Sequence, residues 1–125
     1  MANWRKSMEA SFGAAWRGFL RAFKDERTFR VMVVCALIVF MLVATFPLSD
    51  SERLILILVT GLVLVLELVN TMVERFVDLM KPRLSAYVRD VKDLMAAAVL
   101  VASVFAALIG LMIFVPHLTL FLQQL

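Results

Sequence analysis

Charged residues divide the chain into three long apolar stretches. Val31–Leu48 has 18 residues without a charge, Leu54–Leu66 has 13, and Leu94–Pro116 has 23. A helix needs about 20 residues to cross about 30 Å of hydrocarbon, so the first and third stretches are each long enough to span a membrane. The second is long enough only if the polar residues that follow it belong to the same helix. The pattern therefore predicts membrane helices over 31–48, 54–80 and 94–116.

An amphipathic segment precedes the first span. Seven large apolar residues recur there at helical spacing: Trp4, Met8, Phe12, Trp16, Phe19, Leu20 and Phe23. The charged residues of this segment lie mostly on other faces, which favours a helix in the membrane interface over residues 1–27. A helix packed on the spans is the alternative, and the two descriptions are compatible.

Proline and capping residues mark the connections between these helices. Pro47 ends the first membrane helix, and Ser49 or Asp50 is suited to cap the next one. Pro82 breaks the chain between the second and third spans. We therefore expect an all-α integral membrane protein whose residues 1–125 form a single domain.

The composition agrees with a membrane protein. Hydrophobic residues make up 63% of the chain and the mean hydropathy is +0.95, whereas soluble domains contain about 45–50% apolar residues. This excess must face lipid or a partner. Cys35 is the only cysteine, so no disulfide can form within the chain. A signal peptide fits poorly, because seven basic residues precede a long apolar run without a small-residue cleavage pattern.

Basic residues are distributed unevenly between the two sides of the predicted spans. Seven precede the first span and five lie in the 75–93 segment, whereas the 48–53 turn carries only Arg53. The positive-inside rule therefore places the N-terminus and the 75–93 segment in the cytoplasm, and the 48–53 turn and the C-terminus outside. The net charge of +3 then reflects membrane topology, and no nucleic-acid partner is expected.

A polar stripe follows the second apolar stretch. At 100° per residue, five side chains fall within an arc of about 100°: Glu67, Asn70, Thr71, Glu74 and Asp78. Glu67 lies about 20 Å along the axis from Leu54, which places it roughly 10 Å inside the cytoplasmic edge of the hydrocarbon. An ionisable residue at that depth marks a functional site by default. The alternative is a buried carboxyl that only joins helices.

The stripe suits phosphoryl transfer at a membrane surface. Mg²⁺ prefers oxygen ligands and often takes one or two carboxylates plus substrate phosphates. Glu74 and Glu26, which lies just before the first span, are the best candidates for these carboxylates. Glu67 could accept a proton from a lipid hydroxyl as a general base, and Asn70 could orient the base or the hydroxyl.

Charged residues near the third span extend this candidate site. Lys92 could hold ATP phosphates, although it could also extend its charge to the interface. Asp93 beside it could instead cap the helix. Asp78 is either a solvated helix end or a partner of Arg75 or Lys81. The chain has no Walker glycine loop and no protein-kinase signature, but positioning and electrostatics carry most phosphoryl-transfer catalysis, so another scaffold is acceptable.

Four stretches of the sequence resemble motifs of one known protein family, and the first three stand in the order and spacing of that family. "AAWRGFLRAFKDERTFRV" has a Trp-x-Gly followed by a Glu-x-x-Phe-Arg, and "ELVNTMVERFVDL" reads Glu-x-x-Asn-Thr-x-x-Glu-x-x-x-Asp. "VKDLMAAAVLV" and "IGLMIFVPHL" follow. Together they resemble the prokaryotic diacylglycerol kinase family, which includes undecaprenol kinases, and the last block resembles the tail of the undecaprenol-kinase branch.

The resemblance implies a homotrimer of three-span subunits in a bacterial cytoplasmic membrane, with active sites shared between protomers. It also implies roles for nine residues: Glu67 as catalytic base, Asn70 as its support, Glu26 and Glu74 as Mg²⁺ ligands, Lys92 and Asp93 as ATP contacts, and Ser11, Trp16 and Ala96 near the lipid.

The chain departs from the family pattern at three places. Met72 stands where the family commonly has Ala, and Ser7 stands where a basic residue is usual. Arg83-Leu84-Ser85 replaces a common Glu-x-His. Arg83 and Ser85 are therefore the candidate nucleotide contacts of this loop, and the nucleotide preference stays open.

We therefore expect a lipid kinase that uses Mg²⁺ with ATP to phosphorylate the hydroxyl of diacylglycerol or undecaprenol. The tail resemblance slightly favours undecaprenol. The alternative is a small oligomeric channel or transporter with Glu67 as an intramembrane proton or cation site. A channel would need polar residues that continue to the outer surface, but residues 54–66 offer only Thr60 and the third span only Ser103 and Gly110.

Overall fold

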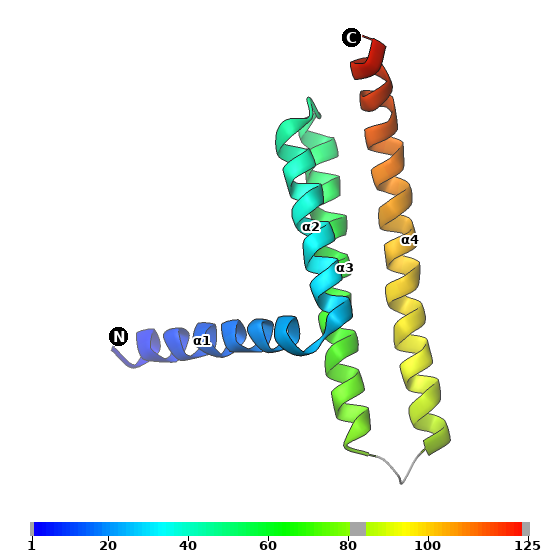
Figure 1. Ribbon diagram of the computed structural model, residues 1–125. Helices are drawn as coiled ribbons and strands as arrows, with labels where there is room; N and C mark the ends of the chain where they lie inside the picture. Colours follow the sequence, from blue (N-terminus) through cyan, green and yellow to red (C-terminus); the bar gives the residue numbers. More distant parts are fainter. Residues whose placement is uncertain (1, 81–84, 124–125) are drawn as a thin grey trace.

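The computed structural model describes residues 2–80 and 85–123. These residues form four helices and contain no strand (Figure 1). The helices are α1 (Ala2–Asp25), α2 (Arg27–Thr45), α3 (Asp50–Asp78) and α4 (Ser85–Gln123). The all-α class predicted from the sequence is confirmed.

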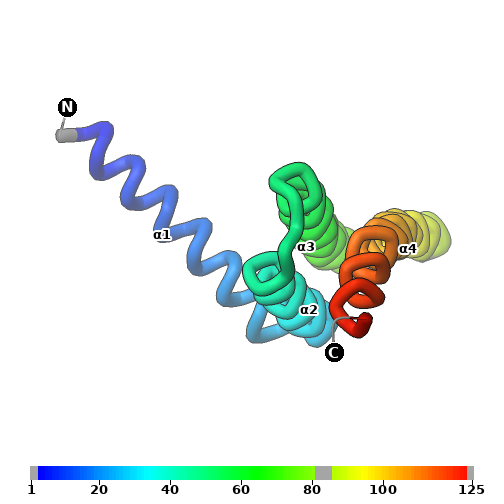
Figure 2. Tube along the Cα trace, turned by 90° about the horizontal axis from the view of Figure 1, so that it is seen from above, coloured from blue at the N-terminus to red at the C-terminus, as the bar shows by residue number. Residues whose placement is uncertain are grey.

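Helices α2, α3 and α4 form a three-helix bundle. They lie side by side in the view from above, while α1 runs away from the group (Figure 2). Each of the three is long and apolar enough to cross a membrane, as the apolar pattern predicts. Their bounds differ from the charge-free stretches, most clearly in α4, which extends beyond 94–116 at both ends. Lack of charge marks the hydrocarbon depth, whereas a helix can continue into the interface and pass through Pro116.

A tight turn joins α2 to α3. Ser49 Oγ accepts a hydrogen bond from Glu52 N at 3.3 Å, and Ser49 N donates to Glu52 Oε2 at 2.7 Å. This reciprocal pair is a capping box, which satisfies two backbone N–H groups at the start of α3. The predicted cap at Ser49 is confirmed.

The hydrophobic core of the bundle lies beside this turn. Val43, Leu48 and Leu56 are buried together and pack against α4. Phe46 and Phe114 meet edge to face with ring centroids 5.6 Å apart. Most other large apolar side chains of α2–α4 stay exposed, which is expected for surfaces that face lipid or another subunit.

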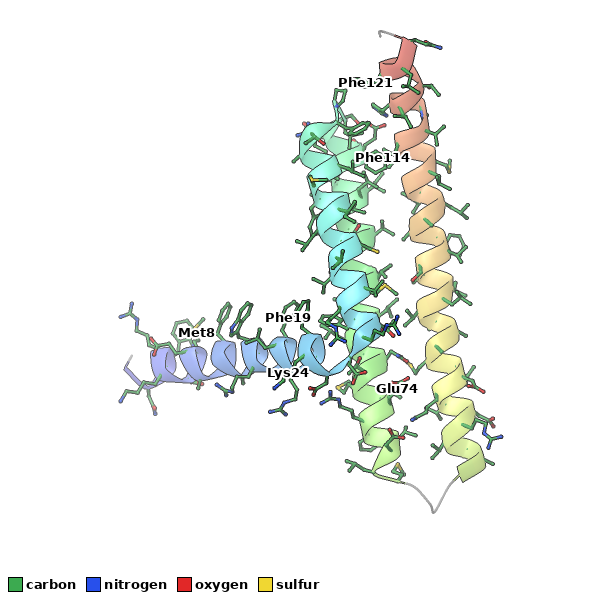
Figure 3. All side chains as sticks on the ribbon, viewed as in Figure 1. Met8, Phe19, Lys24, Glu74, Phe114 and Phe121 are labelled. Carbon is green, nitrogen blue, oxygen red and sulfur yellow. The ribbon has the colours of Figure 1, made fainter. Side chains whose placement is uncertain are left out.

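Helix α1 is held to the bundle at its C-terminal end. Phe29 is fully buried, and Phe19 meets it edge to face at 5.4 Å. Arg30 Nη1 donates to the carbonyls of Phe23 and Lys24 at 3.2 and 2.6 Å, and so satisfies the last turn of α1. Met8 and Phe19 lie on the side of α1 that faces the end of the bundle with the α2–α3 turn, and Lys24 lies on the opposite side (Figure 3).

Candidate active site

A cleft of about 420 Å³ opens between α2, α3 and α4. It is lined at one edge by the α1–α2 corner and along its length by the polar stripe of α3. Eleven residues line it: Glu26, Thr28, Met32, Glu67, Asn70, Thr71, Glu74, Ala96, Val99, Leu100 and Ser103. Glu26, Glu67, Asn70, Glu74 and Ala96, all predicted site residues, are therefore brought together by a single chain.

The stripe on α3 supplies the floor of the cleft. Glu67 and Thr71 are buried at 3% and 7% exposure, and Asn70 and Glu74 are half-buried. Residues three and four apart share one helix face, so this burial follows from the spacing. Glu74 points from α3 toward α4 (Figure 3). Among the residues that the structure describes, no side chain forms a hydrogen bond or ion pair with Glu67.

Glu26 reaches the cleft from the corner between α1 and α2. It occupies the N-cap position of α2 with an extended backbone, φ −105° and ψ 115°. Its N–H donates to Ala22 O and its carbonyl accepts from Arg30 N. The backbone of Glu26 is thus hydrogen-bonded to both α1 and α2. These bonds hold the residue at one height along α3, where its carboxylate enters the cleft.

Arg75 joins this corner to α3. Its Nη2 lies 3.1 Å from Glu26 Oε1 and 3.1 Å from Asp25 Oδ2. The side chains of Arg75, Asp25 and Glu26 are 43%, 46% and 32% exposed, so solvent weakens the attraction between them. This pairing could not be predicted from local sequence patterns, because about fifty residues separate its members.

Asp78 and Lys92 meet across α3 and α4. Lys92 Nζ donates to Asp78 Oδ1 at 2.6 Å. Of the two partners predicted for Asp78, Arg75 instead pairs with Asp25 and Glu26 at the α1–α2 corner, and Lys81 lies outside the described residues. Lys92 and the exposed Asp93 lie one turn before Ala96 on α4, beside the cleft rather than in its lining.

Two other predicted residues, Ser11 and Trp16, do not line the cleft of their own chain. Ser11 and Trp16 are exposed on α1, where Ser11 Oγ donates to Ser7 O and Trp16 stacks on Phe19. Arg83 and the side chain of Ser85 lie outside the described residues.

The carboxylates of the cleft fit a divalent cation that arrives with a nucleotide. Glu67 lies within electrostatic range of Glu74 and Glu26, and three acidic groups so placed repel one another. Arg75 offsets part of this repulsion at Glu26, and a cation bound in the cleft would offset the rest. In the described ranges, no three His, Cys, Asp or Glu side chains are arranged to hold a metal by themselves. Two carboxylates completed by phosphate oxygens and water form the usual environment of Mg²⁺, so Glu26 and Glu74 fit this ion.

Comparison with known sequences decides the family. The family model described as prokaryotic diacylglycerol kinase matches residues 13–114, which include the cleft lining and the ion pairs made by Arg75 and Lys92. The chain belongs to the prokaryotic diacylglycerol kinase family. The family resemblance predicted from the four sequence blocks is thereby confirmed.

Individual members of the diacylglycerol kinase family match most of the chain. An undecaprenol kinase from Bacillus subtilis is 36% identical over 108 residues, which cover 86% of this chain and 88% of that protein. A diacylglycerol kinase from Synechocystis is 33% identical over 109 residues, 86% of this chain and 62% of that protein. A diacylglycerol kinase from Pseudomonas aeruginosa is 32% identical over 90 residues, 72% and 73% of the two chains. The predicted enzyme class, a membrane lipid kinase, is confirmed with the family, and the channel interpretation gains no support.

Ser103 lines the cleft, although no role in the site was predicted for it from the sequence. Its Oγ and the Oδ1 of Asn70 are both buried, and neither atom has a hydrogen-bond partner among the described residues. Buried polar atoms are nearly always paired. The available signal was weak: Ser103 interrupts a long apolar run, and only the packing of α4 on α3 reveals that it faces the stripe.

Proposed function

We propose that the chain transfers the γ-phosphoryl group of ATP to the hydroxyl group of a membrane lipid, in the cleft between α2, α3 and α4. The observation that carries this proposal is the convergence of Glu26, Glu67, Asn70 and Glu74 on one cleft. The cleft holds a deep, buried carboxylate and two shallower ones. That division suits a reaction in which a lipid alcohol comes from the membrane and a nucleotide comes from water.

Glu67 is the general base of the proposed reaction. Its carboxylate is buried and has no partner among the described side chains, so it is free to accept the proton of the lipid hydroxyl as that oxygen attacks the γ-phosphorus. The bond from phosphorus to the ADP oxygen breaks in the same displacement. Asn70, one turn away on the same face, orients the base or the hydroxyl. A positioned base contributes about 10²- to 10⁴-fold to such reactions.

Glu26 and Glu74 hold the nucleotide-bound Mg²⁺ in this proposal. The ion supplies charge neutralisation for the phosphoryl oxygens when it is bound. Lys92 and Asp93 lie next to the cleft on α4 and serve as ATP contacts, with Lys92 acting as a point charge toward phosphate. Arg83, which precedes α4 in the sequence, and Ser85, the first residue of α4, complete the proposed nucleotide site.

The uneven distribution of basic residues supports a cytoplasmic site in a bacterial inner membrane. On this orientation the N-terminus and the 75–93 segment are cytoplasmic and the C-terminus is outside. We further propose a homotrimer with shared active sites. The exposed apolar face of α1 and the distance of Ser11 and Trp16 from their own cleft support it, because these residues would reach lipid at a site only beside a neighbouring subunit.

The acceptor is diacylglycerol or undecaprenol. The names of the relatives above include both activities, and the tail motif favours the isoprenoid. Transfer of labelled phosphate from ATP to each lipid, with purified protein in micelles or bilayers, tests the function and ranks the two acceptors.

Glu67→Gln tests the site in the same assay. We expect at least a 100-fold loss of turnover with unchanged folding and oligomeric state, because the amide cannot accept the proton. Glu9→Gln, on the exposed surface of α1, is the matched control and should retain activity. Near-normal turnover in Glu67→Gln would remove Glu67 from the base role.

A further inference from the structure

The Ser103 hydroxyl is a polar group at membrane depth that has no hydrogen-bond partner among the described residues. Its Oγ is buried, and no atom of the described residues pairs with it. A serine in a helix often satisfies itself by bonding the carbonyl one turn back, as Thr45 does to Met41 O and Ser11 to Ser7 O. Ser103 instead lines the cleft that contains Glu67.

The register of α3 against α4 places Ser103 at the level of Glu67. The helices are antiparallel, with Asp78 facing Lys92 at one end and Glu52 facing His117 at the other. Eleven residues inward from Asp78 on α3 is Glu67, and eleven residues inward from Lys92 on α4 is Ser103. Both steps are about 16 Å along their helix axes, so the two side chains border the cleft at the same depth from opposite helices.

We infer that Ser103 is a substrate-binding residue that donates a hydrogen bond to the hydroxyl oxygen of the acceptor lipid. This inference rests on the proposed role of Glu67. An alcohol oxygen carries one hydrogen and two lone pairs. Its hydrogen is directed to the Glu67 carboxylate, one lone pair attacks phosphorus, and the other accepts from Ser103 Oγ–H. Base and donor on opposite walls would hold the hydroxyl between them.

This role differs from that of a residue that only joins helices. A serine that joins α3 to α4 would be hydrogen-bonded across the interface, and its loss would weaken the fold. A serine that binds substrate has no hydrogen-bond partner in the substrate-free protein, so removing its hydroxyl leaves the stability of the fold unchanged or increased. If Ser103 binds substrate, removing its hydroxyl should therefore weaken the use of lipid without lowering the stability of the protein. If it only joins helices, stability should fall as well.

The test compares three substitutions in the full-length protein in micelles. Ser103→Ala removes the hydroxyl, Ser103→Cys keeps the volume with a weak donor, and Ser103→Thr keeps the hydroxyl. Thr119→Ala is the matched control, because Thr119 is another α4 hydroxyl but donates to Pro116 O, outside the cleft. For each protein, kcat and KM are measured separately for lipid and for MgATP, with thermal unfolding alongside.

We expect Ser103→Ala and Ser103→Cys to lower kcat/KM for lipid about 3- to 10-fold, the effect of one hydrogen bond. The KM for MgATP should stay unchanged, the melting temperature should not fall, and Ser103→Thr should recover most of the loss. The loss should be equal for diacylglycerol and undecaprenol, because both present a hydroxyl.

Three results would overturn the inference. Unchanged lipid kinetics in Ser103→Ala would mean that the hydroxyl has no substrate contact. A lower melting temperature with parallel losses for lipid and MgATP would mean that it supports the fold. A loss confined to diacylglycerol would mean that it contacts an ester group. Retained turnover in Glu67→Gln would instead defeat the proposed base, and the lipid KM values of the Ser103 variants would still be interpretable.

Discussion

Arg75 Nη2 lies 3.1 Å from Glu26 Oε1, at the edge of the cleft proposed to hold the nucleotide-bound metal. The same nitrogen lies 3.1 Å from Asp25 Oδ2, so one guanidinium is shared between two acids. A cation that binds Glu26 must compete with Arg75 for that carboxylate. The ion pair is about two-fifths exposed, so the competition is moderate.

Arg75→Gln should therefore strengthen metal binding. We expect a two- to five-fold tighter apparent affinity for Mn²⁺, about what the loss of a partly exposed ion pair allows. Electron paramagnetic resonance of free Mn²⁺, measured with the protein and a non-hydrolysable ATP analogue, reports this directly. The Mg²⁺ concentration that gives half-maximal activity should fall in parallel.

Arg89→Gln removes an exposed arginine of α4 outside this cluster and should leave both values unchanged. If Arg75→Gln weakened Mn²⁺ binding instead, Arg75 would be a residue that positions Glu26 rather than one that competes for it.

The two proposed metal ligands should respond in the opposite direction. Glu26→Gln and Glu74→Gln each remove one anionic oxygen donor from the cleft and should raise the Mg²⁺ requirement about 10-fold or more, since Mg²⁺ keeps few protein carboxylates. Magnesium titrations of phosphoryl transfer, together with Mn²⁺ binding, measure the effect against Glu9→Gln. Titration curves that coincide with wild type would contradict the ligand assignment.

The fold and the polar face of α3 that forms one wall of the site could be predicted from the sequence, but the contacts between helices could not. Local patterns sufficed for the spans, the Ser49 cap and the α3 stripe, because each depends on residues within a few turns of one another. The pairs Arg75–Glu26 and Asp78–Lys92 depend on how whole helices pack. Ser103 is the clearest case. A single hydroxyl in an apolar run can be placed beside Glu67 only when the register of α4 against α3 is known.

Lys92 should act on nucleotide and not on lipid. Lys92→Gln removes the charge proposed to meet the ATP phosphates, and we expect the KM for MgATP to rise about 10-fold while the KM for lipid stays constant. Lys92→Arg should recover part of the loss, because it restores the charge with a different shape. Steady-state kinetics with each substrate varied in turn separate the two values. A change in the lipid KM alone would place Lys92 on the acceptor instead.

The capping box of α3 should matter for stability and not for chemistry. Ser49→Ala removes the side-chain acceptor for Glu52 N and should lower the melting temperature in micelles by about 2–4 °C. Turnover should stay within about two-fold of wild type, because Glu67 lies about 27 Å along the helix axis from Ser49. Ser51→Ala, two residues further along in the first turn of α3 and without a capping role, is the matched control. A large loss of turnover at unchanged stability would show that the turn and the cleft are coupled.

Both tryptophans of the chain, Trp4 and Trp16, lie on α1 and are exposed at 70% and 58%. Intrinsic tryptophan fluorescence therefore reports the environment of α1 alone. If α1 lies in the interface with its apolar face toward hydrocarbon, lipids brominated near the headgroup end of the acyl chain should quench the emission more strongly than lipids brominated near the bilayer centre. Trp4→Phe and Trp16→Phe separate the two reporters and should give the same order of quenching, because the residues share a face. Quenching that is strongest at the bilayer centre would mean that α1 inserts deeply, and emission that no brominated lipid quenches would mean that another subunit covers this face.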